Sequence, residues 1–162
     1  MAQEIHRSYA LPLAPLTFFE ALHVRETVEH RCAADGLGPT ILVTHQATET
    51  MVRIVVSSDI PTSWLPSIVT SRLSGTPHVV REERWERDAD SGLRSPFTFE
   101  FAGLPVRCAG SATVQPEGDE SRLAVDLVLH IDVPFLGGTI EHAVAPQVAT
   151  ALDAEAAFYR SL

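Results

Sequence analysis

The sequence has few of the features that mark several common classes of protein. Its two cysteines, Cys32 and Cys108, lie far apart and in no C-x-x-C arrangement, whereas disulfide frameworks are typical of shorter secreted chains with many cysteines. We therefore expect both thiols to be reduced. No stretch approaches the roughly 18 continuous apolar residues of a membrane-spanning helix, and the segment from Met1 to Leu13 has no basic region followed by an apolar run. We expect a cytoplasmic protein that does not insert into a membrane.

Positive charge is also scarce. Twelve basic residues stand against 21 acidic ones, which gives a formal net charge of −9 at pH 7. Nucleic acid and anionic membrane surfaces attract clusters of Lys and Arg, so we expect neither as a partner. The sequence contains no G-x-G-x-x-G or G-x-x-x-x-G-K-[ST] phosphate-binding motif and no G-x-S-x-G nucleophile elbow. It therefore carries no signature of a nucleotide-binding protein or a hydrolase, and it predicts no cofactor.

Apolar residues, in contrast, are plentiful. They make up 45% of the 162 residues, which is enough for a sizeable core. The chain has no internal repeat and no linker rich in Gly, Ser or Pro. We therefore expect residues 1–162 to form a single domain.

The clearest pattern lies near the C-terminus. Apolar residues occupy alternate positions between Arg122 and Pro134, which predicts a long, half-buried strand, because successive side chains point to opposite faces. They are Leu123, Val125, Leu127, Leu129, Ile131 and Val133. Gly137 and Gly138 break this alternation, and residues 139–162 then carry apolar residues at helical spacing. A closing helix that lies on a sheet is predicted, with a kink or a late start at Pro146.

The remaining elements follow from similar patterns. Two short helices are predicted after the first strand, opening at Pro15 and at Val24, and the second is expected to end at Gly36 and Gly38. Another short helix is allowed between Ser63, its possible cap, and Leu73. The predicted strands before the C-terminal one are residues 4–11, 40–47, 50–57, 79–87, 96–101 and 106–115.

This order of elements predicts an α+β fold with a curved antiparallel sheet of six to seven strands around a long C-terminal helix. Short turns between consecutive strands favour an antiparallel meander. Because a twisted sheet of this width is broader than one helix, the sheet must curl around it, and side chains need not fill the whole interior. The space between sheet and helix is a candidate pocket.

The order of elements resembles the helix-grip fold of the START and pollen-allergen-like superfamily. Four segments, W-E-R-D at Trp85, A-G-L-P at Ala102, V-P-F-L-G-G-T-I-E at Val133 and the final F-Y-R-S-L, look like an uncharacterised family of that superfamily, a domain of unknown function found in high-GC bacteria. The resemblance implies a sheet that grips the last helix around a hydrophobic cavity. Members of the superfamily bind lipids, sterols or polyketide-like molecules, act as cyclases or assist other proteins. They share no catalytic motif, so no functional residue can be carried over.

Glu155 is the most informative polar residue, because it falls within the apolar stripe of the predicted C-terminal helix. A buried carboxylate needs a partner or a proton. Arg81 and Glu83 share a strand face with Trp85, and Arg7 lies on the inward face of the first strand, so these positions are candidate partners. Two interpretations stay open: a salt bridge between helix and sheet, or the polar end of a ligand pocket.

Other residues are predicted to face the same interior. His45 alternates with Ile41 and Val43 and, if it points inward, could hydrogen-bond a ligand or act as a base, although a lone histidine on an apolar face is usually structural. The further candidates for the cavity lining are apolar or aromatic, and core packing is the default interpretation for each. They are Trp85, Phe97, Phe99, Val148, Leu152 and Tyr159.

A metal site is imaginable but not predicted. His130, Asp132, Glu141 and His142 form an H-x-D plus E-H pattern, yet this spacing is not diagnostic of a metal site. Alternation along a half-buried strand already explains polar residues on its outer face. Trp64, in the interruption of the strand pattern, is expected either to cover a cavity entrance or to belong to a packed surface helix.

These observations predict a protein that binds a hydrophobic or amphipathic small molecule, such as a lipid, sterol or polyketide-like compound, and is not an enzyme. A cyclase or aromatase is the first alternative, and convergence of Glu155, His45 and an arginine inside the pocket would favour it. A module that binds a protein partner through an exposed face is the second. The sequence leaves the oligomeric state open.

Overall fold

The computed structural model describes residues 2–34 and 40–162. The predicted glycine ends of the second helix, Gly36 and Gly38, lie outside these residues. Seven strands form one antiparallel sheet in the order β1-β7-β6-β5-β4-β3-β2. The strands are β1 (Gln3–Leu11), β2 (Thr40–Ala47), β3 (Met51–Asp59), β4 (His78–Arg87), β5 (Leu93–Ala102), β6 (Val106–Glu117) and β7 (Glu120–Ile131).

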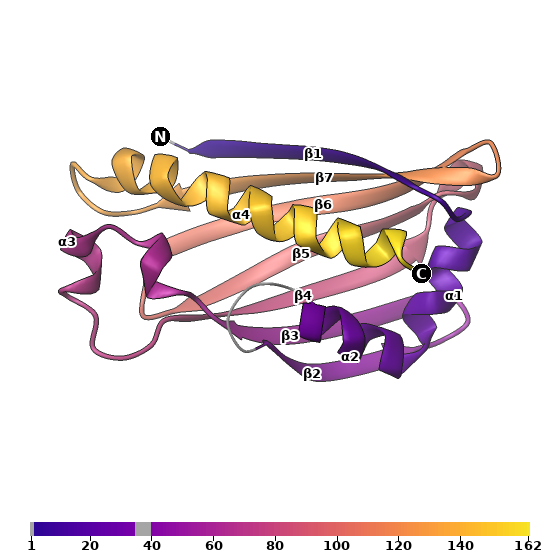
Figure 1. Ribbon diagram of the computed structural model, residues 1–162, viewed down its shortest axis with the longest axis horizontal. Coiled ribbons are helices and arrows are strands. Elements are labelled where there is room, and N and C mark those ends of the chain that lie inside the picture. Colours follow the sequence, from indigo (N-terminus) through magenta and orange to yellow (C-terminus); the bar gives the residue numbers. More distant parts are fainter. Residues whose placement is uncertain (1, 35–39) are drawn as a thin grey trace.

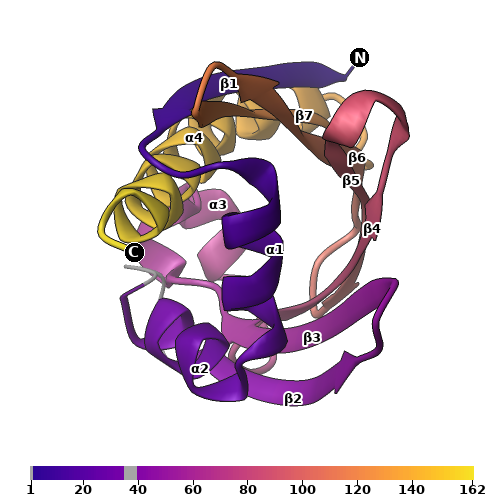
Figure 2. The same ribbon diagram turned by 90° about the vertical axis from the view of Figure 1, so that its right-hand side faces the viewer.

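The helices lie on the concave side of this sheet. The sheet curves strongly, and α4 (Gly137–Arg160) runs along the open side of the arc, next to β1 (Figures 1 and 2). The helices α1 (Pro15–His23) and α2 (Arg25–Ala34) cover one end of the grip. A short 3-10 helix, η1 (Thr62–Trp64), and α3 (Ser67–Thr70) lie at the other end, and a second 3-10 turn, η2 (Ala89–Ser91), joins β4 to β5. The predicted helix-grip architecture is thus confirmed, with seven strands.

The alternation in β7 produces the predicted buried face. Its five inward apolar residues are almost fully buried: Leu123, Val125, Leu127, Leu129 and Ile131. The partner strand β6 approaches β7 very closely at Gly110, where a Cβ atom would lie 2.1 Å from the carbonyl oxygen of Asp126. Only glycine avoids that overlap without a backbone shift. The small residue therefore sets the spacing of β6 and β7 at this point.

Two local predictions need correction. The single helix expected from Ser63 to Leu73 is divided into η1 and α3 by Pro66, since Leu65 takes an extended conformation (φ −102°, ψ 140°), as residues before proline commonly do. Ser63 consequently lies inside η1 and caps no helix. The second correction concerns Pro146, which lies within α4. The helix begins at Gly137, so the alternative of a late start at this proline is wrong.

A β-bulge in β2 changes which residues face inward. The pairing with β3 shifts between Leu42 and Thr44, and a one-residue shift moves side chains to the opposite face. Ile41 and Val43 are therefore exposed, whereas His45, beyond the bulge, lies opposite the buried Ile54. His45 does point toward the helices, but because of the bulge and not because it alternates with Ile41 and Val43.

Candidate functional site

A cavity of about 120 Å³ lies between the concave face of the sheet and α4. Five strands, β3 to β7, form its floor and walls, and η1 with Leu65 covers it at the end away from α1 and α2. The helix α4 contributes one stripe of side chains at helical spacing, namely Val144, Val148, Ala151, Leu152 and Glu155. Most other lining residues are apolar, and those on the sheet include Val56, Val79, Phe99, Phe101, Val106, Leu127, Leu129 and Ile131.

Apart from Ser58 and Asp59, the polar part of the lining is an ion pair between helix and sheet. Arg81 on β4 donates through both terminal nitrogens to the carboxylate of Glu155 on α4, with Nη1–Oε2 and Nη2–Oε1 distances of 2.8 Å. The Tyr159 hydroxyl, one helical turn further along α4, donates to Glu155 Oε1 at 3.3 Å. The Arg81 guanidinium also lies over the ring of Phe97, 4.5 Å from its centroid. Planar, bidentate pairing of this kind fixes geometry as well as charge.

A second ion pair lies behind the first. Arg31 on α2 donates to both oxygens of Glu83 on β4, at 3.0 and 2.6 Å, and to the Tyr159 hydroxyl at 2.8 Å. The indole nitrogen of Trp85 donates to Glu83 Oε1 at 2.9 Å. The two pairs are also linked, because Arg81 Nη2 lies 3.3 Å from Glu83 Oε2. We call Arg31, Arg81, Glu83 and Glu155 the charged quartet.

Three members of the quartet are buried, the Arg81 side chain is 13% exposed, and the four charges sum to zero. Glu83 has no exposed surface, and Arg31 and Glu155 are 2% and 7% exposed. Burial by itself would raise the pKa of Glu155, but the charges of Arg81 and Arg31 and the hydrogen bonds from Arg81 and Tyr159 lower it to about 2. Burial opposes ionisation of Glu83 too, and the same two arginines hold its pKa below the usual range. Both carboxylates are therefore ionised at neutral pH, each opposite an arginine.

The structure places five of the ten predicted cavity residues in the lining. These five are Arg81, Phe99, Val148, Leu152 and Glu155. Glu83 and Tyr159 belong to the network behind the lining, and Trp85 and Phe97 pack in the neighbouring aromatic core, their ring centroids 6.2 Å apart. His45 lies elsewhere: its Nε2 donates to the carbonyl oxygen of Leu22 on α1 at 2.8 Å. It therefore does not meet Glu155 and Arg81.

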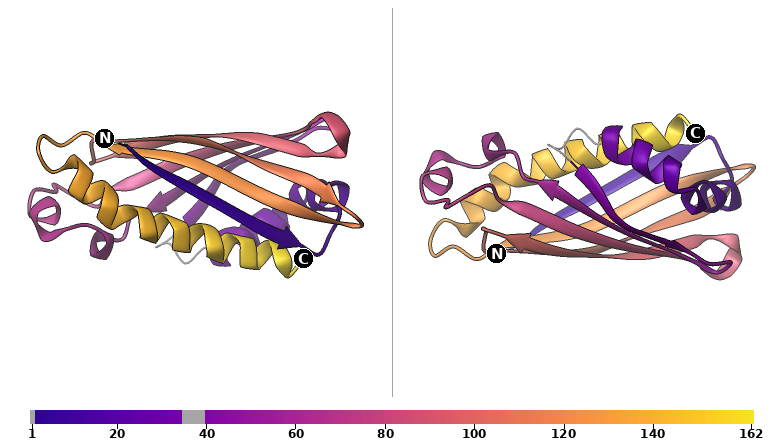
Figure 3. Two further views of the ribbon diagram at one scale, coloured as in Figure 1. Left: turned by 90° about the horizontal axis from the view of Figure 1, so that it is seen from above. Right: turned by 90° about the horizontal axis from the view of Figure 1, so that it is seen from below.

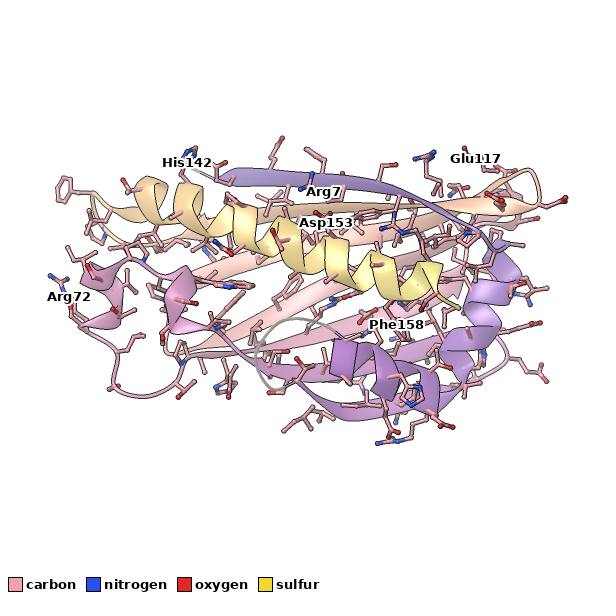
Figure 4. The ribbon with its side chains drawn as sticks, in the orientation of Figure 1. Arg7, Arg72, Glu117, His142, Asp153 and Phe158 are labelled. Carbon is pink, nitrogen blue, oxygen red and sulfur yellow. The ribbon has the colours of Figure 1, made fainter. Side chains whose placement is uncertain are left out.

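Sequence reasoning missed Arg31. It precedes Cys32 on α2 and follows Val28 by three positions, so it borders the buried face of that helix. That spacing was the only available signal, since its partner Glu83 is 52 residues away. Arg7, a proposed partner of Glu155, pairs instead with Asp153 at a partly exposed position, with 3.3 Å between Nε and Oδ1. Figure 4 shows Arg7 on β1 beside Asp153 on α4.

Two other polar groups near the cavity bear on its chemistry. Burial raises the pKa of the Cys108 thiol, part of the lining, to about 12, and the charge of Arg81 offsets this only in part. The thiol is thus protonated at neutral pH and a poor nucleophile.

Near the start of α4, the buried Glu141 accepts a hydrogen bond from the backbone nitrogen of Ile131 and lies 3.4 Å from His130 Nδ1. Within residues 2–34 and 40–162, no three His, Cys, Asp or Glu side chains gather as metal ligands would.

A family model described as "Protein of unknown function (DUF2505)" matches residues 5–162. The chain belongs to this family. An uncharacterised relative from Mycobacterium tuberculosis, Rv0481c, is 25% identical over 109 residues, which are 66% of this chain. The match spans 63% of that relative's own length.

Solved structures share the fold. A START superfamily protein from Mycobacterium smegmatis superposes with a TM-score of 0.54 and 10% identity, over 98% of this chain and 97% of that one. A STAR-related lipid transfer protein from Xanthomonas axonopodis gives a TM-score of 0.56 and 16% identity, over 97% and 85% of the two chains. This DUF2505 member therefore has the helix-grip fold of the START superfamily. Among the residues that the structure describes, no helix combines the length and apolar character needed to cross a bilayer.

Proposed function

We propose that this protein binds a hydrophobic small molecule in the cavity between its sheet and α4. The observation that carries the proposal is the cavity itself: about 120 Å³ of space, lined almost entirely by apolar side chains, in the interior of the grip. A dry apolar cavity of about 150 Å³ is known to hold a molecule the size of benzene. Burial of an apolar ligand in such a space is favourable because it removes apolar surface from water.

The polar residues near the cavity favour binding of a ligand over catalysis. The convergence of Glu155, His45 and an arginine that would favour a cyclase is incomplete, since His45 bonds to Leu22. Glu155 and Arg81 are engaged with each other, and a carboxylate with a pKa of about 2 is a weak base at neutral pH. The lipid transfer protein among the structural neighbours supports the same direction. A lipid or sterol larger than the cavity would require η1 and Leu65 to move from its end.

The test is a cavity-filling substitution with a matched control on the same helix. Ala151 lines the cavity, whereas Ala157 is exposed. Titration calorimetry with hexan-1-ol as the probe is expected to detect binding to the wild type and to Ala157→Phe but not to Ala151→Phe. Loss of a folded circular dichroism spectrum in Ala151→Phe would be checked first, with the smaller Ala151→Leu as a substitute. Equal binding by the filled and unfilled proteins would refute the proposal.

The natural ligand can be sought directly. Native mass spectrometry of the protein purified from its own host is expected to show a bound mass that organic extraction removes. Identification of the extracted compound would then give the ligand. A clean apoprotein mass, together with no hexan-1-ol binding, would contradict the proposed function.

A further inference from the structure

We infer that the cavity selects uncharged ligands and rejects carboxylates and amines of the same carbon skeleton. This inference rests on the proposed function and specifies its ligand class. It concerns fatty acids in particular, because their hydrocarbon chains would suit the apolar lining. The argument is a balance of charges at the inner end of the cavity.

The charged quartet leaves no charge available to a ligand. Two arginines face two glutamates, so the sum is zero, and every carboxylate oxygen already accepts a hydrogen bond. Glu155 receives Arg81 and Tyr159. Glu83 receives Arg31 and Trp85. Arg81 Nε is buried without a hydrogen-bond partner, so it can donate to a neutral oxygen of a ligand. Arg81 is the one arginine among the described residues of the lining, and its charge is already balanced by Glu155. A ligand carboxylate would therefore gain no counter-ion unless it displaced Glu155.

Burial makes such a displacement unfavourable. A fifth charge placed beside the quartet would lose its hydration without gaining a counter-ion, and uncompensated charge is costly in an apolar interior. Among the lining residues that the structure describes, the one other ionisable carboxylate is Asp59, at an exposed position, and its negative charge opposes the approach of anions. Binding of an ammonium ion at the inner end is also unfavourable, because both buried glutamates are already paired with arginines. A hydroxyl, ketone or ester carries no net charge and avoids these costs.

The test compares three probes with the same six-carbon chain: hexan-1-ol, hexanoate and hexylammonium, titrated separately into the wild-type protein at pH 7. We expect hexan-1-ol to bind at least tenfold more tightly than either ion. Binding of hexanoate or hexylammonium as tight as that of the alcohol would overturn the inference while leaving the proposed function intact. Binding of none of the three would overturn both.

Substitutions in the quartet should change the preference in a predictable direction. Glu155→Gln leaves Arg81 without its carboxylate, so hexanoate is expected to gain at least tenfold relative to hexan-1-ol. Arg81→Met leaves an excess of negative charge and should favour hexylammonium instead. The matched control is Glu82→Gln, the same change on the same strand at a partly exposed ion pair with Arg53, which should leave the order of the three probes unchanged. An equal shift in the control would refute the role of the quartet.

A neutral double variant keeps the test decisive if a single variant does not fold. Arg81→Met combined with Glu155→Leu removes both charges of the first pair and leaves Arg31 with Glu83. We expect hexan-1-ol to remain the preferred probe in this protein. A preference for hexanoate in the double variant would overturn the inference, because selectivity would then originate outside the quartet.

Discussion

Replacement of Arg31 by methionine removes the centre of the buried network while keeping a side chain of similar length. Arg31 is 2% exposed and donates three hydrogen bonds, two to Glu83 and one to Tyr159. In the variant, Glu83 stays fully buried with Trp85 as its remaining hydrogen-bond donor and with Arg81 Nη2 at 3.3 Å. A buried carboxylate thus loses the arginine that lies closest to it.

The expected cost is about 3–5 kcal/mol, the range measured when one partner of a buried ion pair is removed. Native domains are stable by only about 5–15 kcal/mol, so the variant is expected to be severely destabilised. Urea denaturation followed by circular dichroism at pH 7 measures the loss. On the same helix, Arg25→Met breaks an exposed pair with Glu29 and should cost less than about 1 kcal/mol.

A second substitution identifies the physical origin of the cost. Glu83→Gln in the Arg31→Met background removes the uncompensated charge and keeps an oxygen for the Trp85 nitrogen. We expect the double variant to be more stable than Arg31→Met alone, because replacement of a whole buried pair is often tolerated. A loss below about 1 kcal/mol in Arg31→Met, or additive losses in the double variant, would refute the reasoning.

Two further predictions concern acid and backbone spacing. The pKa of Glu155 is about 2 in the folded protein, below its value in the unfolded chain. The stabilising contribution of Glu155 is therefore present above pH 4.5 and disappears as the pH falls toward 2. The free energy of unfolding lost from this group is about 3 kcal/mol. Urea midpoints measured at pH 7, 4 and 2.5 should fall in that order, and a constant midpoint would contradict the assignment. Gly110→Ala should destabilise the protein by about 1–3 kcal/mol. The control is Gly138→Ala, where a Cβ meets nothing within 4 Å, and it should be neutral or stabilising. Equal thermal midpoints for the two variants would show that Gly110 does not set the strand spacing.

Periodicity in the sequence predicted the elements that form the grip. The alternation from Leu123 to Ile131 and the helical spacing after Thr139 are local properties of the chain, and both appear in β7 and α4. Pro66 also predicts a break in the helix, since residues before proline avoid helical conformations. This rule predicts two separate short helices at this point, and not the single helix expected across Pro66.

The pairing of the quartet could not be predicted in the same way. The position of Glu155 within an apolar stripe predicted a buried carboxylate, and Arg81 was one of several candidate partners. Arg31 reaches Glu83 only because α2 packs over the concave side of the sheet, near β2 and α4. The bulge at Leu42–Thr44, which turns His45 inward, likewise depends on the pairing of β2 with β3. Tertiary packing, and not local pattern, decides both features.

The strand order has a consequence for how the chain is made. Among the described strands, β1 pairs with β7 alone, where Gln3 lies opposite Leu129 and Leu11 opposite Ser121 (Figure 3). β1 therefore has no native strand partner until β7, residues 120–131, has been synthesised. Contacts this distant in sequence are typical of slow folding, and an unpaired strand edge invites association with other chains. This topology is therefore more exposed to failure during synthesis, while β1 waits for β7, than in the finished fold.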